Sequence, residues 1–244
     1  MQVKTILNHV QRQPGFVYES VRLVRGVGGA EIEVGVRSRA GTRPKCSGCD
    51  QPGAGYDRLG SRRFEFVPLW GLAVFLVYVM RRVDCRRCGV RVEAVPWAEG
   101  KNQLTTTYAW FLASWAKRLS WREVAQAFHT SWENVFRSVE LAVGWGLTHR
   151  SLDRIHSIGI DEIQWQRGHK YLTLVYQIDA GCRRLLWIGQ DRKLKTLLRF
   201  FRFFGKERSA TLRYICSDMW KPYLRVVAKK ANQAIHVLDR FHIM

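Results

Sequence analysis

The chain has 244 residues, of which 47% are hydrophobic and 12% aromatic, so it can bury cores and is not a disordered protein. Lys and Arg outnumber Asp and Glu by 40 to 20, which favours a polyanionic partner, although charge alone leaves a ribosomal or membrane-surface protein open. The first residues do not resemble a secretory signal, and the most apolar run, residues 66–80, is too short to span a bilayer. We therefore expect a soluble, cytoplasmic protein with no membrane partner.

The composition changes twice along the chain. Residues 1–100 are rich in Gly, Arg and Val and have the pattern of strands, residues 101–150 are helical, and residues 151–244 alternate strands with helices. The zones predict a multidomain α+β protein with three domains at these bounds. They are a β-rich domain at residues 1–100, a helical domain at residues 101–150 and an α/β domain at residues 151–244.

Four of the six cysteines form two C-x2-C pairs, "CSGC" at 46–49 and "CRRC" at 85–88. Two such pairs can place four thiolates around Zn²⁺, and a site closed by four cysteines is structural, since catalysis needs an open position. The interval between the pairs predicts a hairpin, with strands near residues 62–67 and 73–84. Two disulfides or two chance pairs are the alternatives, and the absence of a signal peptide disfavours disulfides. The predicted zinc ligands are Cys46, Cys49, Cys85 and Cys88.

Arginines are dense around these cysteines, and phosphate oxygens are their natural partners in DNA. For any one arginine alone, a solvated surface position is the preferred interpretation. We predict DNA contacts for Arg62, Arg63, Arg86 and Arg87, with Arg58, Arg81, Arg82 and Arg91 as further candidates. The two isolated cysteines, Cys182 and Cys216, are predicted to be small buried residues.

The helical zone begins with Thr residues at 105–107 that can cap a helix running to about Leu119. Ser120 and Glu123 form a capping box that opens a short helix, and "HTS" separates it from a longer helix capped by Ser131. This succession predicts a helix-turn-helix, in which the start of the last helix reaches base edges. An ordinary three-helix bundle that binds nothing is the alternative. The predicted DNA-contacting residues are Ser131, Trp132, Asn134 and Arg137.

The last zone predicts five strands and two helices, in the order of a ribonuclease-H-like domain. Three strands come first, then a basic amphipathic helix, a fourth strand, a second helix and a fifth strand. The first strand is expected to end at Asp161 and the fourth at Asp218. The expected strands cover residues 156–161, 170–179, 183–190, 213–218 and 234–241, and the expected helices cover residues 192–206 and 222–232.

In that order the first and fourth strands lie side by side, which brings Asp161 and Asp218 to one edge of the sheet. Two carboxylates placed together repel each other and favour a cation, and two divalent ions can activate an attacking oxygen and stabilise the leaving oxygen of a phosphodiester. We therefore predict that both acids bind Mg²⁺ or Mn²⁺. A single Asp at a strand end is more often a turn residue or helix cap, which is our interpretation of Asp179 and Asp191. Glu162 is expected to be a solvated neighbour, His242 to be structural, and Asp239 stays open.

Together these motifs resemble the ISL3 family of bacterial insertion-sequence transposases, which carry a zinc-binding domain, a helix-turn-helix and a DDE catalytic domain. The resemblance rests on the two cysteine pairs, "SWREVAQAF" at 120–128, "GIDE" at 159–162, "SDMWKPY" at 217–223 and "DRFH" at 239–242. It implies recognition of terminal inverted repeats, metal-dependent strand cleavage and transfer to target DNA, in a homo-oligomer associated with the bacterial nucleoid. Residue by residue, it makes Asp161 and Asp218 the first two catalytic acids and the four cysteines the zinc ligands.

One departure from the family is serious. The family's third catalytic acid is a Glu beyond the "DRFH" segment, and no Glu follows Asp218 in these 244 residues. We therefore expect an incomplete catalytic domain, in a polypeptide that binds DNA but is inactive in transposition by itself. A non-catalytic DNA-binding regulator of transposition is the alternative function, and a single-strand nuclease or junction resolvase on the same fold is a weaker one. A sheet without its covering helix further predicts marginal stability or aggregation.

Overall fold

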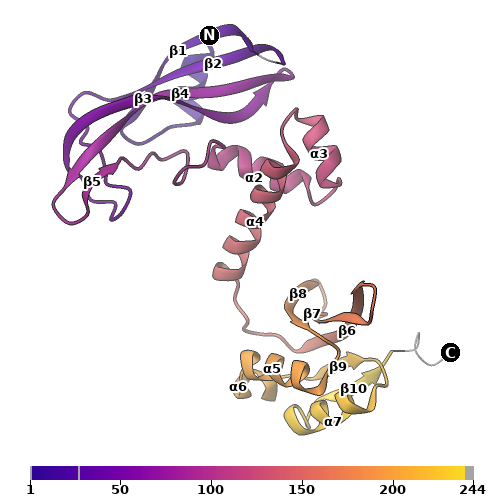
Figure 1. Ribbon diagram of the computed structural model, residues 1–244. Helices are drawn as coiled ribbons and strands as arrows, with labels where there is room; N and C mark the ends of the chain where they lie inside the picture. The colour runs from indigo at the N-terminus through magenta and orange to yellow at the C-terminus, as the bar shows by residue number, and fades with distance from the viewer. Residues whose placement is uncertain (1, 27, 240–244) are drawn as a thin grey trace. The chain divides into compact units, whose positions relative to one another are not determined.

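The chain divides between His149 and Arg150 into two units (Figure 1). The computed structural model describes residues 2–26 and 28–239. Within these ranges, no helix has both the length and the apolar character needed to cross a membrane. The helical residues 106–149 belong to the same unit as the β-rich residues that precede them, and the second predicted boundary, near residue 150, coincides with the division between the units.

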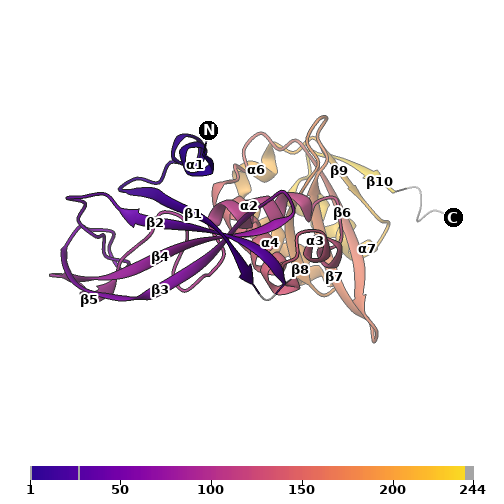
Figure 2. The ribbon, with the colours of Figure 1, turned by 90° about the horizontal axis from the view of Figure 1, so that it is seen from above.

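The first unit is built on one five-stranded sheet. It contains α1 (Val3–Val10), β1 (Phe16–Gly26), β2 (Gly29–Ser38), β3 (Ala54–Leu69), β4 (Leu72–Cys85) and β5 (Gly89–Val92). The strand order is β1-β2-β4-β3, with β5 also paired to β4, and Figure 2 shows β4 between β2 and β3. The pair β2–β4 is parallel and the other pairs are antiparallel.

The hairpin predicted between the cysteine pairs is present, with longer strands than expected. It is closed by Trp70 and Gly71, whose φ angles of 55° and 77° are those of a type I′ turn, which suits the twist of a two-residue hairpin. Alternate residues of β4 are buried, and they pack with Phe64 and Trp97 into the core of the sheet. The aromatic contacts in this core are edge-to-face, the arrangement that aromatic quadrupoles favour.

One of the candidate DNA-binding arginines belongs instead to this interior. Arg81 lies 2.7 Å from Glu93, whose side chain is fully buried, and Glu93 also accepts hydrogen bonds from the Tyr78 hydroxyl and the Arg81 backbone. The Arg81 side chain is only 15% exposed. An unpaired charge here would be costly, so we conclude that Arg81 neutralises Glu93 and is not free to bind phosphates.

Three helices complete the first unit: α2 (Thr106–Trp115), α3 (Trp121–Ala127) and α4 (Trp132–His149). The predicted caps are confirmed, because Thr105 caps α2, Ser120 and Glu123 form the capping box of α3, and the Ser131 hydroxyl accepts from the Asn134 amide. Helix α2 ends four residues earlier than expected. Its start is tied to β3, because the amide and hydroxyl of Thr105 both donate to the Glu65 carbonyl.

The second unit is a five-stranded sheet with three helices. It contains β6 (Ser157–Gln166), β7 (Lys170–Gln177), β8 (Arg184–Gln190), α5 (Leu194–Phe204), α6 (Lys206–Ala210), β9 (Tyr214–Ser217), α7 (Lys221–Lys230) and β10 (Ile235–Leu238). The strand order is β10-β9-β6-β7-β8, so β6 and β9 are parallel neighbours, as predicted for a ribonuclease-H-like domain. The short helix α6 was not predicted. It follows Gly205, whose φ of 91° ends α5.

The expectation that the first strand ends at Asp161 was wrong. Pairing with β7 continues through Asp161 opposite Leu174 and on to Gln166 opposite Lys170, so Asp161 lies in the middle of β6. Helices α5 and α7 pack on the face of the sheet that carries Ile158, Ile160 and Val175. Apolar side chains elsewhere in the sheet are exposed among the described residues, including Ile163, Ile188, Ile235 and Val237.

Candidate catalytic and metal-binding sites

The parallel pairing of β6 and β9 sets Asp161 and Asp218 level with each other. Ile158 pairs with Ile215 and Gly159 with Cys216, and this register, continued by two residues, reaches Asp161 and Asp218. Asp218 is the first residue after β9. The prediction that neighbouring strands carry these two acids to one place in the sheet therefore agrees with the backbone.

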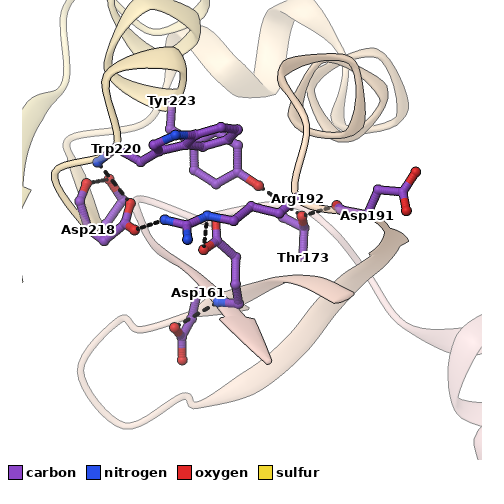
Figure 3. A network of polar contacts seen from close by, with 9 residues as sticks. Asp161, Thr173, Asp191, Arg192, Asp218, Trp220 and Tyr223 are labelled. Atoms are coloured by element: carbon purple, nitrogen blue, oxygen red, sulfur yellow. Dashed lines mark hydrogen bonds and ion pairs between the residues drawn. The ribbon is translucent and has the colours of Figure 1, made fainter. Parts of the chain in front are cut away.

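The two carboxylates nevertheless have different surroundings (Figure 3). Asp161 is exposed, and its Oδ1 accepts from the Glu162 amide at 2.7 Å. Asp218 is only 16% exposed and accepts from Arg192 Nη2 at 2.8 Å and from the Trp220 amide at 3.1 Å. Outside the cysteine cluster, the described residues contain no group of three acidic, histidine or cysteine ligands within 4.8 Å of one another.

Glu162 is part of this site, and the expectation of a solvated neighbour was wrong. Its side chain is 10% exposed, and its Oε2 lies 2.7 Å from Arg192 Nε. Successive side chains of a strand point to opposite faces, so Glu162 shares the helix-covered face with Ile160, whereas Asp161 points the other way. Arg192 thus joins two buried carboxylates, and its guanidinium lies 5.0 Å from the centre of the Trp220 ring.

The electrostatics of Glu162 follow from this burial. Desolvation raises the pKa of Glu162, the nearby Asp218 carboxylate raises it further, and Arg192 opposes both effects without cancelling them. The folded protein therefore holds this proton more tightly than the unfolded chain. Its contribution to stability is present at low pH and is lost as the pH rises through the raised pKa.

The oxygens gathered here suit a hard divalent cation. Oε1 of Glu162 is buried and has no hydrogen-bond partner in the described part of the chain. Mg²⁺ and Mn²⁺ prefer carboxylate oxygens, and a buried carboxylate oxygen without a partner is the kind of group that an ion can satisfy. Glu162 and Asp218, which share Arg192 on the covered side, are therefore the pair placed to hold such an ion, whereas Asp161 points to the opposite face.

We expect Arg192→Leu to lower the free energy of unfolding of the second unit by about 1–3 kcal/mol, because it leaves two largely buried carboxylates without their shared cation. Urea denaturation measures the change, and added Mg²⁺ should restore part of the loss. Lys193→Ala is the matched control, because its ion pair with Asp191 is exposed and should contribute less than about 0.5 kcal/mol. Equal effects of the two substitutions would contradict this role of Arg192.

The four paired cysteines come together as predicted. Their sulfur atoms all lie within 4.8 Å of one another, and all six cysteines of the chain are free thiols. Cys46 and Cys49 precede β3, Cys85 ends β4, and Cys88 lies in the turn before β5. The two disulfides considered as an alternative are therefore not formed, and the sulfur donor set fits a structural Zn²⁺.

Backbone amides prepare one of these thiols for metal binding. Hydrogen bonds from the amides of Arg87 and Cys88 lower the pKa of Cys85 to about 7. The thiolate is the form that binds a metal, so this sulfur is available near neutral pH. Gly89, which follows the last cysteine, has a φ of 71° and lets the chain turn back into β5.

Four of the eight predicted DNA-contacting residues border one cavity. Arg62 and Arg63 of β3 face Asn134 and Arg137 of α4 across about 570 Å³. Some of these side chains also bind within the protein: Arg63 pairs with Glu31 at 2.6 Å and Arg137 with Glu133 at 2.5 Å. The side-chain amide of Asn134 donates to the Glu65 carboxylate and to the Thr130 hydroxyl.

The other four DNA candidates lie outside this cavity. Ser131 caps α4, and Trp132 is 52% exposed and stacks on Phe136. Arg86 and Arg87 are exposed in the turn between the last two cysteines, where neither forms an ion pair within the described ranges. They are the freest of the eight to contact a phosphate.

The remaining residues singled out from the sequence have local roles or lie outside the description. Asp179 accepts from the His156 amide and from Gln177, as expected of a turn residue, and Asp191 pairs with Lys193 in the connection after β8. Cys182 and Cys216 are half-buried rather than buried. The amide of Asp239, after β10, donates to Ser217, whereas His242 and the rest of "DRFH" lie outside the described residues.

Sequence analysis did not find Arg192. It follows Asp191 in a stretch with the pattern of a helix start, and no spacing rule connects it to Asp218, 26 residues later. The adjacent acids Asp161 and Glu162 were the one available signal, because in a strand one of two successive side chains faces the covered side, where a carboxylate needs a cationic partner.

Comparisons with known proteins agree with the motifs. Residues 158–244 match the ISL3 family of DDE transposases, described as "Transposase". The chain is 32% identical over 220 residues to the transposase for insertion sequence element IS1557 of Mycobacterium tuberculosis H37Rv. It is 26% identical over 200 residues to the transposase for insertion sequence element IS1001 of Bordetella parapertussis. These alignments cover 88% and 80% of this chain and 49% of each relative, so the chain spans about half the length of the curated relatives it matches. With the cysteine cluster and the strand order already described, these matches support an ISL3-family insertion-sequence transposase.

Proposed function

We propose that this chain forms the DNA-binding part and the first portion of the catalytic domain of an insertion-sequence transposase. It binds the terminal inverted repeats of its element, and its acids serve metal-dependent strand cleavage and transfer to target DNA. The observation that carries the proposal is the register of β6 and β9, which sets Asp161 and Asp218 level on neighbouring strands of a domain that matches a transposase family.

In this proposal Asp161 and Asp218 are the catalytic metal ligands, and the buried Glu162 supports them from the covered face. Bound Mg²⁺ or Mn²⁺ supplies a Lewis acid that activates the attacking oxygen and stabilises the leaving oxygen of the phosphodiester. Arg192 and the Trp220 amide hold the Asp218 carboxylate in one orientation. This matters because positioning contributes a large part of catalysis.

The first unit supplies DNA recognition in this proposal. Helices α3 and α4 act as a helix-turn-helix, in which Ser131, Trp132, Asn134 and Arg137 face the duplex. Zn²⁺ held by the four cysteines fixes the turn that carries Arg86 and Arg87, and Arg62 and Arg63 extend the basic surface along β3. We also propose that the protein acts as a homo-oligomer on paired DNA ends.

A second function, a DNA-binding regulator of transposition, is favoured by one observation. Asp161 points away from Asp218 and Glu162, and outside the cysteine cluster the described residues contain no group of three possible metal ligands within 4.8 Å of one another. Both functions need recognition of the transposon ends and differ only in cleavage.

We expect the 244-residue chain to bind a duplex carrying its element's inverted repeat at least about 10³-fold more tightly than random duplex, the lower range of specific DNA binders. Fluorescence anisotropy at a fixed salt concentration measures both affinities. Asn134→Ala and Arg137→Ala should reduce the preference, whereas Lys117→Ala, which alters an exposed residue outside the predicted contacts, should leave it unchanged. Equal affinity for both duplexes would contradict the proposed function.

A further inference from the structure

The second unit contains a cavity that the proposed catalytic site does not use. It lies between α5, α6 and α7, has a volume of about 790 Å³, and is bordered by five cationic side chains. No Asp or Glu is among its described lining residues. The five cations are Arg202, Lys206, Arg225, Lys229 and Lys230.

The floor of the cavity is apolar and its edges are charged. Leu194, Leu198, Phe201 and Val226 form the apolar part, where α5 and α7 approach each other. Two cations come from the end of α5 and the start of α6, and three come from α7. Arg225 and Lys229 are four residues apart on α7, so they lie on one face about 6 Å apart along the helix axis. We call this cavity the groove; positive charge borders it from α5 and α6 and from α7.

None of the five cations has an acidic partner within the described residues. Of the other cations of this unit, only Arg192, Lys193 and Arg208 form ion pairs within the described residues, so these five differ from the rest in surrounding one cavity. The helix macrodipole accounts for Lys229 and Lys230 in the last turn of α7, but it disfavours Lys206 at the first position of α6. Five like charges around one groove repel one another, and a polyanion would relieve that repulsion.

We propose that this groove is a separate binding surface for the phosphate backbone of duplex DNA. The choice of DNA rests on the proposed function, whereas the position of the surface rests only on the groove and its unpaired cations. Residues 151–244 carry 18 Lys and Arg against 8 Asp and Glu, so the whole unit favours a polyanion. A DNA strand presents negative charge at regular intervals of a few ångströms, so several of the five cations can contact phosphates of one strand at the same time. Because backbone contacts carry no sequence information, the groove should bind any duplex, as a target-DNA surface must.

The test uses the full 244-residue chain and a random-sequence duplex of about 30 base pairs, titrated between about 50 and 200 mM salt. Arg202→Glu/Arg225→Glu should weaken binding at least about tenfold and lower the slope of log affinity against log salt by about 2, one for each lost phosphate contact. The matched control is Arg154→Glu/Arg183→Glu, which makes the same charge change at two exposed arginines of this unit outside the groove. The control should change both quantities by much less, and equal effects of the two variants would overturn the proposal.

Acetylation of lysines, followed by mass spectrometry, gives a second measurement on the unaltered protein. Bound random duplex should protect Lys206, Lys229 and Lys230 and leave Lys170 in the β6–β7 hairpin reactive. If the three lysines stay reactive while the inverted repeat is still preferred, the groove proposal fails and the proposed function stands. If the repeat is not preferred but the lysines are protected, the proposed function fails and the groove stands. Protection by poly-glutamate but not by duplex DNA would assign the groove to an acidic protein and overturn the proposal.

Discussion

Chelation of the metal, or the substitution Cys85→Ser, will lower the melting temperature of the first unit by at least about 10 °C, because structural Zn²⁺ contributes several kcal/mol or more to small β modules. The cysteines join two segments that are distant in sequence, 46–49 and 85–88, and together they provide four sulfur ligands. Without an ion, the sulfur atoms have only backbone amide donors, such as those of Arg87 and Cys88 at Cys85, and weak contacts with one another, such as the 3.6 Å contact of Cys49 with Cys85. Circular dichroism melting with and without chelator measures the loss, and elemental analysis should find one zinc per chain.

The matched control for this substitution is Cys182→Ser, which changes a half-buried thiol of the second unit in the same way. It should leave both the zinc content and the melting of the first unit unchanged. A chain that melts at the same temperature with and without chelator, or that binds no zinc, would show that the four cysteines are not a structural metal site. Because thiolates bind the metal, zinc affinity should also fall as the pH drops, and the fall should steepen below about 7, where Cys85 is protonated as well.

The second prediction with a large expected effect is that this chain alone does not cleave DNA. Incubated with Mg²⁺ or Mn²⁺ and its inverted-repeat DNA, the 244-residue polypeptide is expected to bind the DNA without cleaving it. The acids available are Asp161, Glu162 and Asp218, and Arg192 neutralises the last two. Loss of one ligand from a two-metal site removes orders of magnitude in rate, since electrostatic stabilisation of the transition state is the largest contribution to catalysis. Denaturing gel electrophoresis of end-labelled DNA detects nicking at the 3′ ends.

The IS1557 transposase, about twice as long as this chain, is the positive control when assayed on the ends of its own element. Specific nicking by the 244-residue chain would contradict the prediction. In that case Asp161→Asn and Glu162→Gln separate the two neighbouring acids. Asp161→Asn should abolish nicking if Asp161 is the ligand, whereas Glu162→Gln should abolish it only if the buried acid takes that role.

Sequence patterns predicted the parts of this protein that depend on rare residues or local periodicity. Paired C-x2-C motifs identify their partners because few other arrangements place cysteines two residues apart twice, and the four sulfur atoms do come together. The order of strands and helices was sufficient to predict that β6 and β9 are neighbours. The caps of Ser120 and Ser131 were predicted because capping is a local interaction over three residues.

The contacts that sequence could not supply are those set by strand length and by packing between elements. Because we expected the first strand to end at Asp161, we did not predict that Glu162 continues the alternation of the strand and faces the helices. The contact between Arg192 and Asp218 joins two connections, one after β8 and one after β9, whose geometry depends on the packed helices. The groove between α5 and α7 could not be predicted for the same reason. Periodicity predicts an apolar face on α5, but it does not predict where the neighbouring helix leaves part of that face uncovered.

The parallel pairing of β2 with β4 has a consequence for how fast the first unit folds. The antiparallel pairs β1–β2 and β3–β4 join strands that are close in sequence, whereas Glu31 must find Ala73 to start the parallel pair. Closing a loop of about 40 residues costs on the order of 3 kcal/mol in chain entropy, and such non-local contacts slow folding. An ion that captures the cysteines at 46–49 and 85–88 early links the segment after β2 to the end of β4 and shortens the path between Glu31 and Ala73 from about 42 to about 27 residues. The zinc site would therefore speed the refolding of the sheet modestly as well as raise its final stability.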